Sequence, residues 1–176
     1  MKFVVSGLLA LSLLAGSPAG AQEAAPEFKP GIPGLKMADV REHKHLWREI
    51  EELQSWERSE RITVAEYRAK VIEKTTVFLG FGGEAATSFS TLAAQSVAGL
   101  REAFAAGRKT DIDPSRPDSA FAAELTATVE RVTAKLSPEP RHQLFVPDVK
   151  KWLLRLAFGP SEAREAKEIA ASKPTS

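Results

Sequence analysis

The sequence predicts an all-α protein, an irregular bundle of four main helices followed by a fifth helix that a proline breaks. Apolar side chains recur at intervals of three and four along successive segments, which is the spacing of one face of an α-helix. Two segments open with an acidic or hydroxyl residue followed three positions later by Glu, a pattern typical of helix starts. Past the first residues there is no alternating β-branched run bounded by turns, so a sheet is not expected.

Residues 1–21 have the organisation of a secretory signal peptide. Lys2 supplies a basic start, an apolar run follows, and small residues lead to the triplet Ala-Gly-Ala that ends at Ala21. We therefore expect cleavage before Gln22 and export to the periplasm or the extracellular space. The apolar run is shorter than the roughly 20 residues of a membrane span, so no stable membrane anchor is expected after cleavage.

The composition of the chain disfavours some classes of partner and excludes chemistry that depends on cysteine. The whole chain has a net charge of +1, and Lys2 is the charged residue of the leader, so residues 22–176 are formally neutral. Interspersed charges of both signs create no basic field, and nucleic acid is therefore not an expected partner. The chain has no cysteine, which excludes disulfides, thiol catalysis and thiolate metal sites.

Residues 22–38 are predicted to be a tether, because proline or glycine recurs too often there for a helix. A single helical domain is expected over residues 39–159. Its first helix is predicted over 39–59, with Asp39 and Glu42 as a capping box. The apolar side of this helix contains Val40, His43, Leu46, Trp47, Ile50, Leu53 and Trp56 or Glu57.

The second helix is predicted to begin with a capping box of Thr63 and Glu66 and to end at the glycines of residues 80–83. Its apolar side contains Tyr67, Val71, Lys74 or Thr75, and Phe78. The third helix is predicted over 84–106 with Gly107 as its stop. We expect this helix to be central, because its many small residues allow neighbours to approach closely.

A loop is predicted over 108–118 and a fourth helix over 119–136, whose apolar side contains Phe121, Leu125, Val129, Val132 and Leu136. Ser137 before Pro138 predicts the start of the fifth helix. Pro147 should interrupt it, so that Asp148 caps a further segment from Val149 to Phe158. Residues 160–176 contain little to bury and are predicted to be a polar tail.

The three histidines supply some of the ligands of a possible metal site, but not a complete set. His45 and Glu49 lie one helical turn apart, whereas His43 and His45 lie about 200° apart around a helix and cannot share one ion. Zinc takes three or four protein ligands, so a site would need another group, such as His142. We predict no metal, no cofactor and no catalytic residue. A metal-responsive periplasmic protein that uses His43 or His45 with Glu49 and His142 is the first alternative, and an enzyme of unrecognised type is the second.

Trp47 and Trp56 are the candidate binding residues. They are nine positions apart, about 180° around a helix, so they cannot both face one core. One of them is expected to be exposed, to cover a partner, or to pack onto the proline-rich tether. Because Trp is favoured at interaction hot spots, the predicted function is a non-catalytic exported binding protein. Its partner is expected to be a protein, and the pattern indicates no oligomeric state.

The segment Leu136-Ser137-Pro138-Glu139-Pro140-Arg141 resembles the Leu-Thr-x-x-Gln signature of the periplasmic Spy/CpxP/ZraP-like stress proteins. Residues 62–68, Ile-Thr-Val-Ala-Glu-Tyr-Arg, are similar in outline. The signature Gln is replaced by Pro140 in one copy and by Glu66 in the other. The resemblance implies an exported all-helical chaperone that needs no ATP, or an envelope-stress or metal-responsive regulator, often a cradle-shaped dimer.

Overall fold

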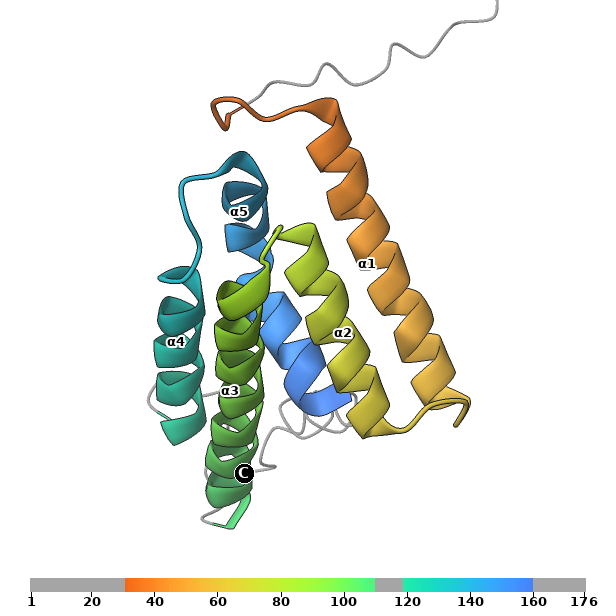
Figure 1. Ribbon diagram of the computed structural model, residues 1–176. Helices are drawn as coiled ribbons and strands as arrows, with labels where there is room; N and C mark the ends of the chain where they lie inside the picture. Colours follow the sequence, from red (N-terminus) through yellow and green to blue (C-terminus); the bar gives the residue numbers. More distant parts are fainter. Residues whose placement is uncertain (1–30, 110–118, 160–176) are drawn as a thin grey trace, which may run out of the picture.

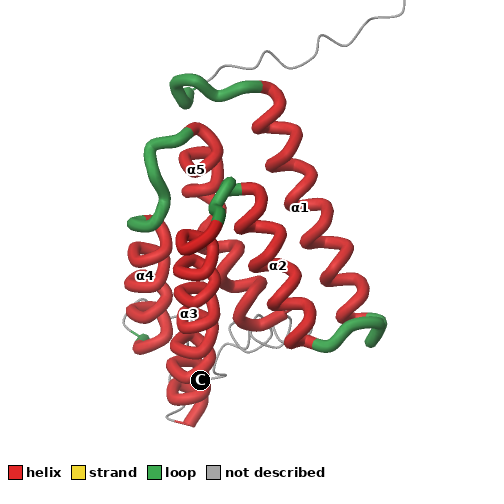
Figure 2. The backbone as a smooth tube through the Cα atoms, viewed as in Figure 1, coloured by secondary structure: helices red, strands yellow, loops and turns green. Residues whose placement is uncertain are grey.

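The computed structural model describes residues 31–109 and 119–159, which form helices and connecting turns without a strand (Figures 1 and 2). The predicted all-α class is therefore confirmed. The predicted signal peptide, residues 22–30 of the predicted tether, most of the predicted loop over 108–118 and the predicted polar tail lie outside the described residues.

Four long helices follow one another with alternating direction, namely α1 (Met37–Arg58), α2 (Val64–Phe78), α3 (Gly83–Lys109) and α4 (Ala120–Thr133). The short helix α5 (Pro140–Phe145) and one 3-10 turn, η1 (Val146–Asp148), then lead into the helical residues 149–159. In Figure 1 the long helices lie side by side in the order α4, α3, α2, α1, and α5 and residues 149–159 lie behind them.

The helical residues 149–159 occupy the centre of the core, a position that the sequence analysis gave to α3. Six of their side chains are at most 4% exposed, namely Val149, Trp152, Leu153, Leu156, Ala157 and Phe158. Phe158 meets Phe104 of α3 and Phe121 of α4 at centroid distances of 5.0 and 5.7 Å. The prediction failed because this segment is apolar around most of its circumference, which is typical of a surrounded helix. Small residues of α3 such as Ala94 and Ala98 are exposed instead.

Two arginines from different helices hold the end of this central helix. Arg68 of α2 donates from Nε to the Leu156 carbonyl at 3.1 Å and from Nη2 to the Ala157 carbonyl at 2.9 Å. Arg101 of α3 donates to the same Ala157 carbonyl at 3.1 Å. The last carbonyls of a helix lack intrahelical donors and carry partial negative charge, so both guanidinium groups stabilise this end.

The first helix starts two residues earlier than predicted, and its predicted capping box is wrong. Lys36 is the N-cap, and Asp39 is the third helical residue, whose Oδ2 accepts the Lys36 backbone N–H at 2.9 Å. Glu42 does not serve the helix start, because its carboxylate pairs with Arg141 at 2.7 Å. The second predicted box is confirmed, since Thr63 accepts the Glu66 amide and Glu66 accepts the Thr63 amide.

Three other predicted helix limits differ from the structure by more than one residue. Gly107 does not end α3, which continues to Lys109, and α4 ends at Thr133 instead of Leu136. The fifth helix begins at Pro140 and not at Ser137, because the Ser137 N–H donates to the His142 ring and thus belongs to a turn. The predicted interruption at Pro147 is confirmed as the 3-10 turn η1.

Candidate functional site

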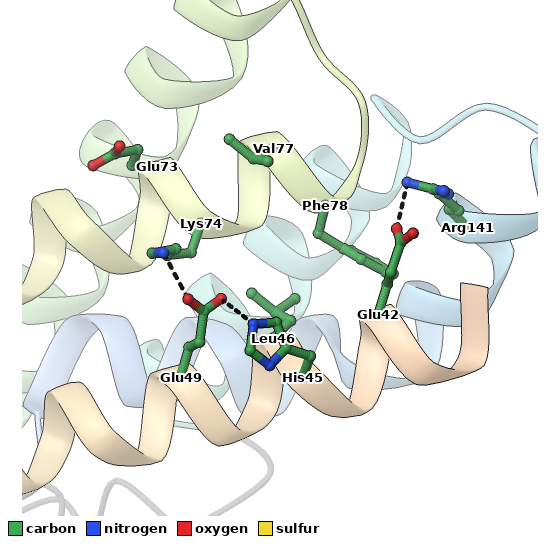
Figure 3. A pocket seen from close by; sticks show the side chains of 9 residues that line it. All are labelled: Glu42, His45, Leu46, Glu49, Glu73, Lys74, Val77, Phe78 and Arg141. Carbon is green, nitrogen blue, oxygen red and sulfur yellow. Dashed lines mark hydrogen bonds and ion pairs between the residues drawn. The ribbon is translucent and has the colours of Figure 1, made fainter. Parts of the chain in front are cut away.

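Two grooves flank the C-terminal half of α2. The first, which we call the α1–α2 groove, has a volume of about 380 Å³. It is shown in Figure 3 and is lined by Glu42, His45, Leu46, Glu49, Glu73, Lys74, Val77, Phe78 and Arg141. The second, the α2–α3 groove, has a volume of about 560 Å³. Its lining consists of Ala69, Ile72, Glu73, Thr76, Val77, Phe81, Gly82, Gly83, Ala86 and Ser90.

The cations of the α1–α2 groove are already paired with carboxylates. Lys74 lies 2.6 Å from Glu49, and this hydrogen bond raises the pKa of Lys74 above its ordinary value. Arg141 bonds Asp39 at 2.8 Å and Glu42 at 2.7 Å. These ion pairs join α1 to α2 and to α5, so they explain the packing of the groove walls and leave neither cation free for a ligand.

The α2–α3 groove is apolar and is walled partly by very small side chains. Ile72, Phe81 and Ala86 supply apolar surface, and Phe81 is held by ring contacts with Phe89 at 5.1 Å and with His142 at 5.0 Å. Gly83 at the start of α3 adds no side chain to its wall. A partner's backbone could therefore approach α3 closely.

Val77 and Glu73 form the ridge between the two grooves, since both side chains line both of them. They are four positions apart and share one face of α2. The Val77 side chain is 70% exposed, whereas Met37 at 49% is the other large hydrophobic side chain exposed in the described residues. Glu73 makes no ion pair with another described side chain. The ridge thus presents an uncovered apolar group beside an unpaired carboxylate.

The sequence analysis did not identify this ridge. The buried side of α2 contains Tyr67, Val71, Thr75 and Phe78, as predicted. Val77 lies about 200° from Thr75 around the helix and therefore on the outer face. The sequence nevertheless contains one signal for the ridge. Val77 is a β-branched apolar residue that lies outside the three-and-four spacing of the buried side of α2.

Trp47 and Trp56 are both partly buried and pack against the core, so the prediction that they cannot both face one core is wrong. Lys151 and Arg155 of the central helix lie over the Trp47 ring, with Nζ of Lys151 4.0 Å from its centroid. Both tryptophans are covered because α1 contacts α2 on one side and residues 149–159 on another. The buried part of the α1 surface is therefore wider than the single apolar side that the spacing predicts. Neither tryptophan lines the α1–α2 groove or the α2–α3 groove.

The three histidines lie in three different environments. His45 is 65% exposed and lies 3.7 Å from Glu49 in the α1–α2 groove. His43 is mostly buried, and its Nε2 lies 2.9 Å from Asp148 Oδ2. His142 is 2% exposed and is bonded to Leu79 and Ser137. The structure does not bring the predicted metal ligands together, and the described residues contain no group of three His, Asp or Glu side chains placed to hold a metal ion.

Ser137 and His142 form a contact that sequence reasoning missed, with Oγ 2.8 Å from Nδ1. A hydroxyl beside an imidazole is the first requirement of a nucleophilic serine. Here, however, Nδ1 also accepts the Ser137 backbone N–H at 2.9 Å, and Nε2 faces the Leu79 carbonyl at 2.8 Å. Neither residue lines the α1–α2 groove or the α2–α3 groove. The arrangement therefore connects the α4–α5 turn to the end of α2.

His43 makes the free energy of unfolding depend on pH. Burial lowers the pKa of His43 below its ordinary value of 6.5, and the nearby Lys151 acts in the same direction, although Asp148 opposes the shift. Above pH 6.5 both the folded and the unfolded states hold a neutral ring, and the stability is fully present. As the pH falls, the unfolded state takes up the proton first, so the protein loses stability.

We expect stability measured by urea unfolding to decrease between pH 6.5 and about pH 5, and the His43→Gln variant to show a flatter profile there. His45→Gln is the matched control, because His45 is 65% exposed. Asp39, Glu66 and Glu124 also have lowered pKa values, but their ordinary values of 3.8 and 4.5 place their effect at lower pH. Equal profiles for the His43→Gln variant and the unmodified protein would contradict the assignment.

No protein-family model, no curated protein and no solved structure matches the chain. None of the helices in residues 31–109 and 119–159 has both the length and the apolar composition of a membrane-spanning segment.

Proposed function

We propose that this protein is a non-catalytic binding protein, exported after cleavage before Gln22, that binds protein partners through the ridge of Val77 and Glu73 and the grooves beside it. The observation that carries the proposal is the 70% exposure of Val77 between two grooves. Grooves lined partly by apolar side chains are typical of binding sites, and Val77 contributes to both of them. The ridge replaces Trp47 and Trp56 as the proposed contact, because both tryptophans pack against the core.

A periplasmic chaperone or envelope-stress role is the most specific form of this proposal. It is supported by the predicted signal peptide and by the resemblance of residues 136–141 to the Spy/CpxP/ZraP-like signature. The apolar α2–α3 groove is suited to short apolar segments of an unfolded client, since client binding depends on exposed apolar surface more than on specific polar contacts. The metal-responsive alternative has less support, since His45 and Glu49 lie 3.7 Å apart but the described residues contain no group of three His, Asp or Glu side chains placed to hold a metal ion.

The proposal predicts that the purified mature protein delays the aggregation of a chemically unfolded client, followed by light scattering. We expect Val77→Asp to abolish most of this delay, because a carboxylate on the ridge would have to be desolvated on binding, at a cost of several kcal/mol. The fold should be retained, since surface substitutions usually change stability by about 0.5 kcal/mol or less.

Met37→Asp is the matched control. Met37 is the other exposed large hydrophobic residue, it lines neither groove, and it lies in the first turn of α1, where a carboxylate is favourable. This variant should delay aggregation as well as the unmodified protein does. If Val77→Asp and Met37→Asp lose the delay of aggregation equally, exposed apolar surface in general is responsible and the ridge is not the site. If the unmodified protein causes no delay, the chaperone form of the proposal is excluded.

A further inference from the structure

We propose that the occupant of the α2–α3 groove is a short amphipathic α-helix of another protein, with basic side chains beside its apolar stripe. This inference rests on the proposed function and specifies the partner. It depends on the shape of the groove, on the backbone groups that its walls offer, and on the charge at the ridge.

The shape of the groove fits a helix. Its walls are two antiparallel helices, and the α2 wall from Ala69 to Val77 has nine residues, which span about 12 Å or two helical turns. On the opposite wall Gly83, Ala86 and Ser90 recur at intervals of three and four, so they share one face of α3. A third helix could thus lie close to α3 while its apolar stripe covers Ile72, Phe81 and Val77.

The groove walls favour a partner that satisfies its own backbone. The lining residues of α2, and Ala86 and Ser90 of α3, use their backbone N–H and C=O groups within the helices and their turns, whereas the N–H of Gly83 lies in the first turn of α3 and has no intrahelical acceptor. An extended segment would have to bury its own amides against these walls without acceptors or donors, which is costly. A helix has its backbone bonds already made, so only its side chains have to fit.

The charge at the ridge favours a basic partner. Glu73 is the charged residue of the α2–α3 lining, it is exposed, and it has no ion-pair partner among the described side chains. Lys74, a cation of the adjacent groove, is bonded to Glu49 at 2.6 Å and has only a charge interaction with Glu73. A lysine or arginine at the edge of the partner's apolar stripe would therefore meet an unpaired carboxylate next to Val77.

The test uses the full-length mature protein and two fluorescent probes. One probe is a helical peptide of about 14 residues, made of leucine, alanine and lysine, and its twin has glutamate in place of every lysine. We expect the lysine peptide to bind more tightly, and added salt to reduce the difference. Glu73→Lys should weaken binding of the lysine peptide about fivefold or more, the equivalent of roughly 1 kcal/mol for an exposed ion pair, and should strengthen binding of the glutamate twin.

Glu102→Lys is the matched control, because Glu102 is an exposed residue of α3 that lines neither groove. If the lysine and glutamate peptides bind equally and Val77→Asp abolishes the binding of both, the inference of a basic partner is overturned. The proposed function would still stand in that case. If neither peptide binds, this inference is overturned, whereas the proposed function depends on the delay of client aggregation and on its loss in Val77→Asp. Self-association that Val77→Asp removes would identify a second copy as the occupant and would overturn this inference.

Discussion

Replacing Trp152 with Ala is expected to lower the free energy of unfolding by about 3–5 kcal/mol, a large part of the total for a domain of this size. Trp152 is fully buried at the centre of the bundle. It stacks on Phe89 of α3 and meets Phe145 of α5 edge-on, each at a centroid distance of 5.8 Å. Its removal would leave a cavity that three separate elements border, so collapse could fill little of it. Urea unfolding followed by circular dichroism measures the loss.

The Trp152 indole also has one polar contact whose contribution can be separated from packing. Its Nε1–H donates to Thr75 Oγ1 of α2 at 3.0 Å. Thr75→Val keeps the volume and removes the acceptor, which should cost about 1–3 kcal/mol because the N–H stays buried without a partner. Thr126→Val is the matched control, since both hydroxyls donate to the carbonyl four residues earlier but Thr126 is exposed. Equal losses for the two variants would contradict the assigned role of Thr75.

The helical content could be predicted from the sequence because it depends on local spacing. Thr63 with Glu66 marks a helix start through contacts within one turn, and a glycine after α2 adopts a φ of 73° that ends it. The start of α1 was misplaced because Asp39 and Glu42 both bind Arg141, a residue about a hundred positions away. A competing partner from another element cannot be recognised from a local pattern.

The position of the central helix and the candidate site depend on packing between elements, which spacing does not specify. The pattern identifies the apolar side of each helix but not which helix the others surround. Trp47 illustrates this limit, because its ring is covered by Lys151, a charged residue of a segment about a hundred positions away. The ridge was missed because an apolar residue was expected to be covered by a neighbouring helix. Val77 is apolar, and it is 70% exposed on the outer face of α2.

His142 is expected to be the most important polar residue for stability. The Ser137 N–H donates to Nδ1, so the proton of the neutral ring lies on Nε2 and is donated to the Leu79 carbonyl at 2.8 Å. This ring therefore joins the α4–α5 turn to the end of α2. His142→Phe would keep a ring beside Phe81 and leave both backbone groups without their partner. Each unpaired buried group costs about 1–3 kcal/mol, so we expect a total loss of about 2–5 kcal/mol.

The matched control for this prediction is His45→Phe, the same substitution at a histidine that is 65% exposed, which should change stability by about 0.5 kcal/mol or less. His142→Gln should recover part of the loss, because an amide offers one acceptor and one donor as the ring does. Hydrogen exchange can locate the effect, since the amide of Ser137 should lose protection in His142→Phe before the amides of α3 do. If His142→Phe were as stable as the unmodified protein, water would have to satisfy Leu79 and Ser137, and the ring would act through packing alone.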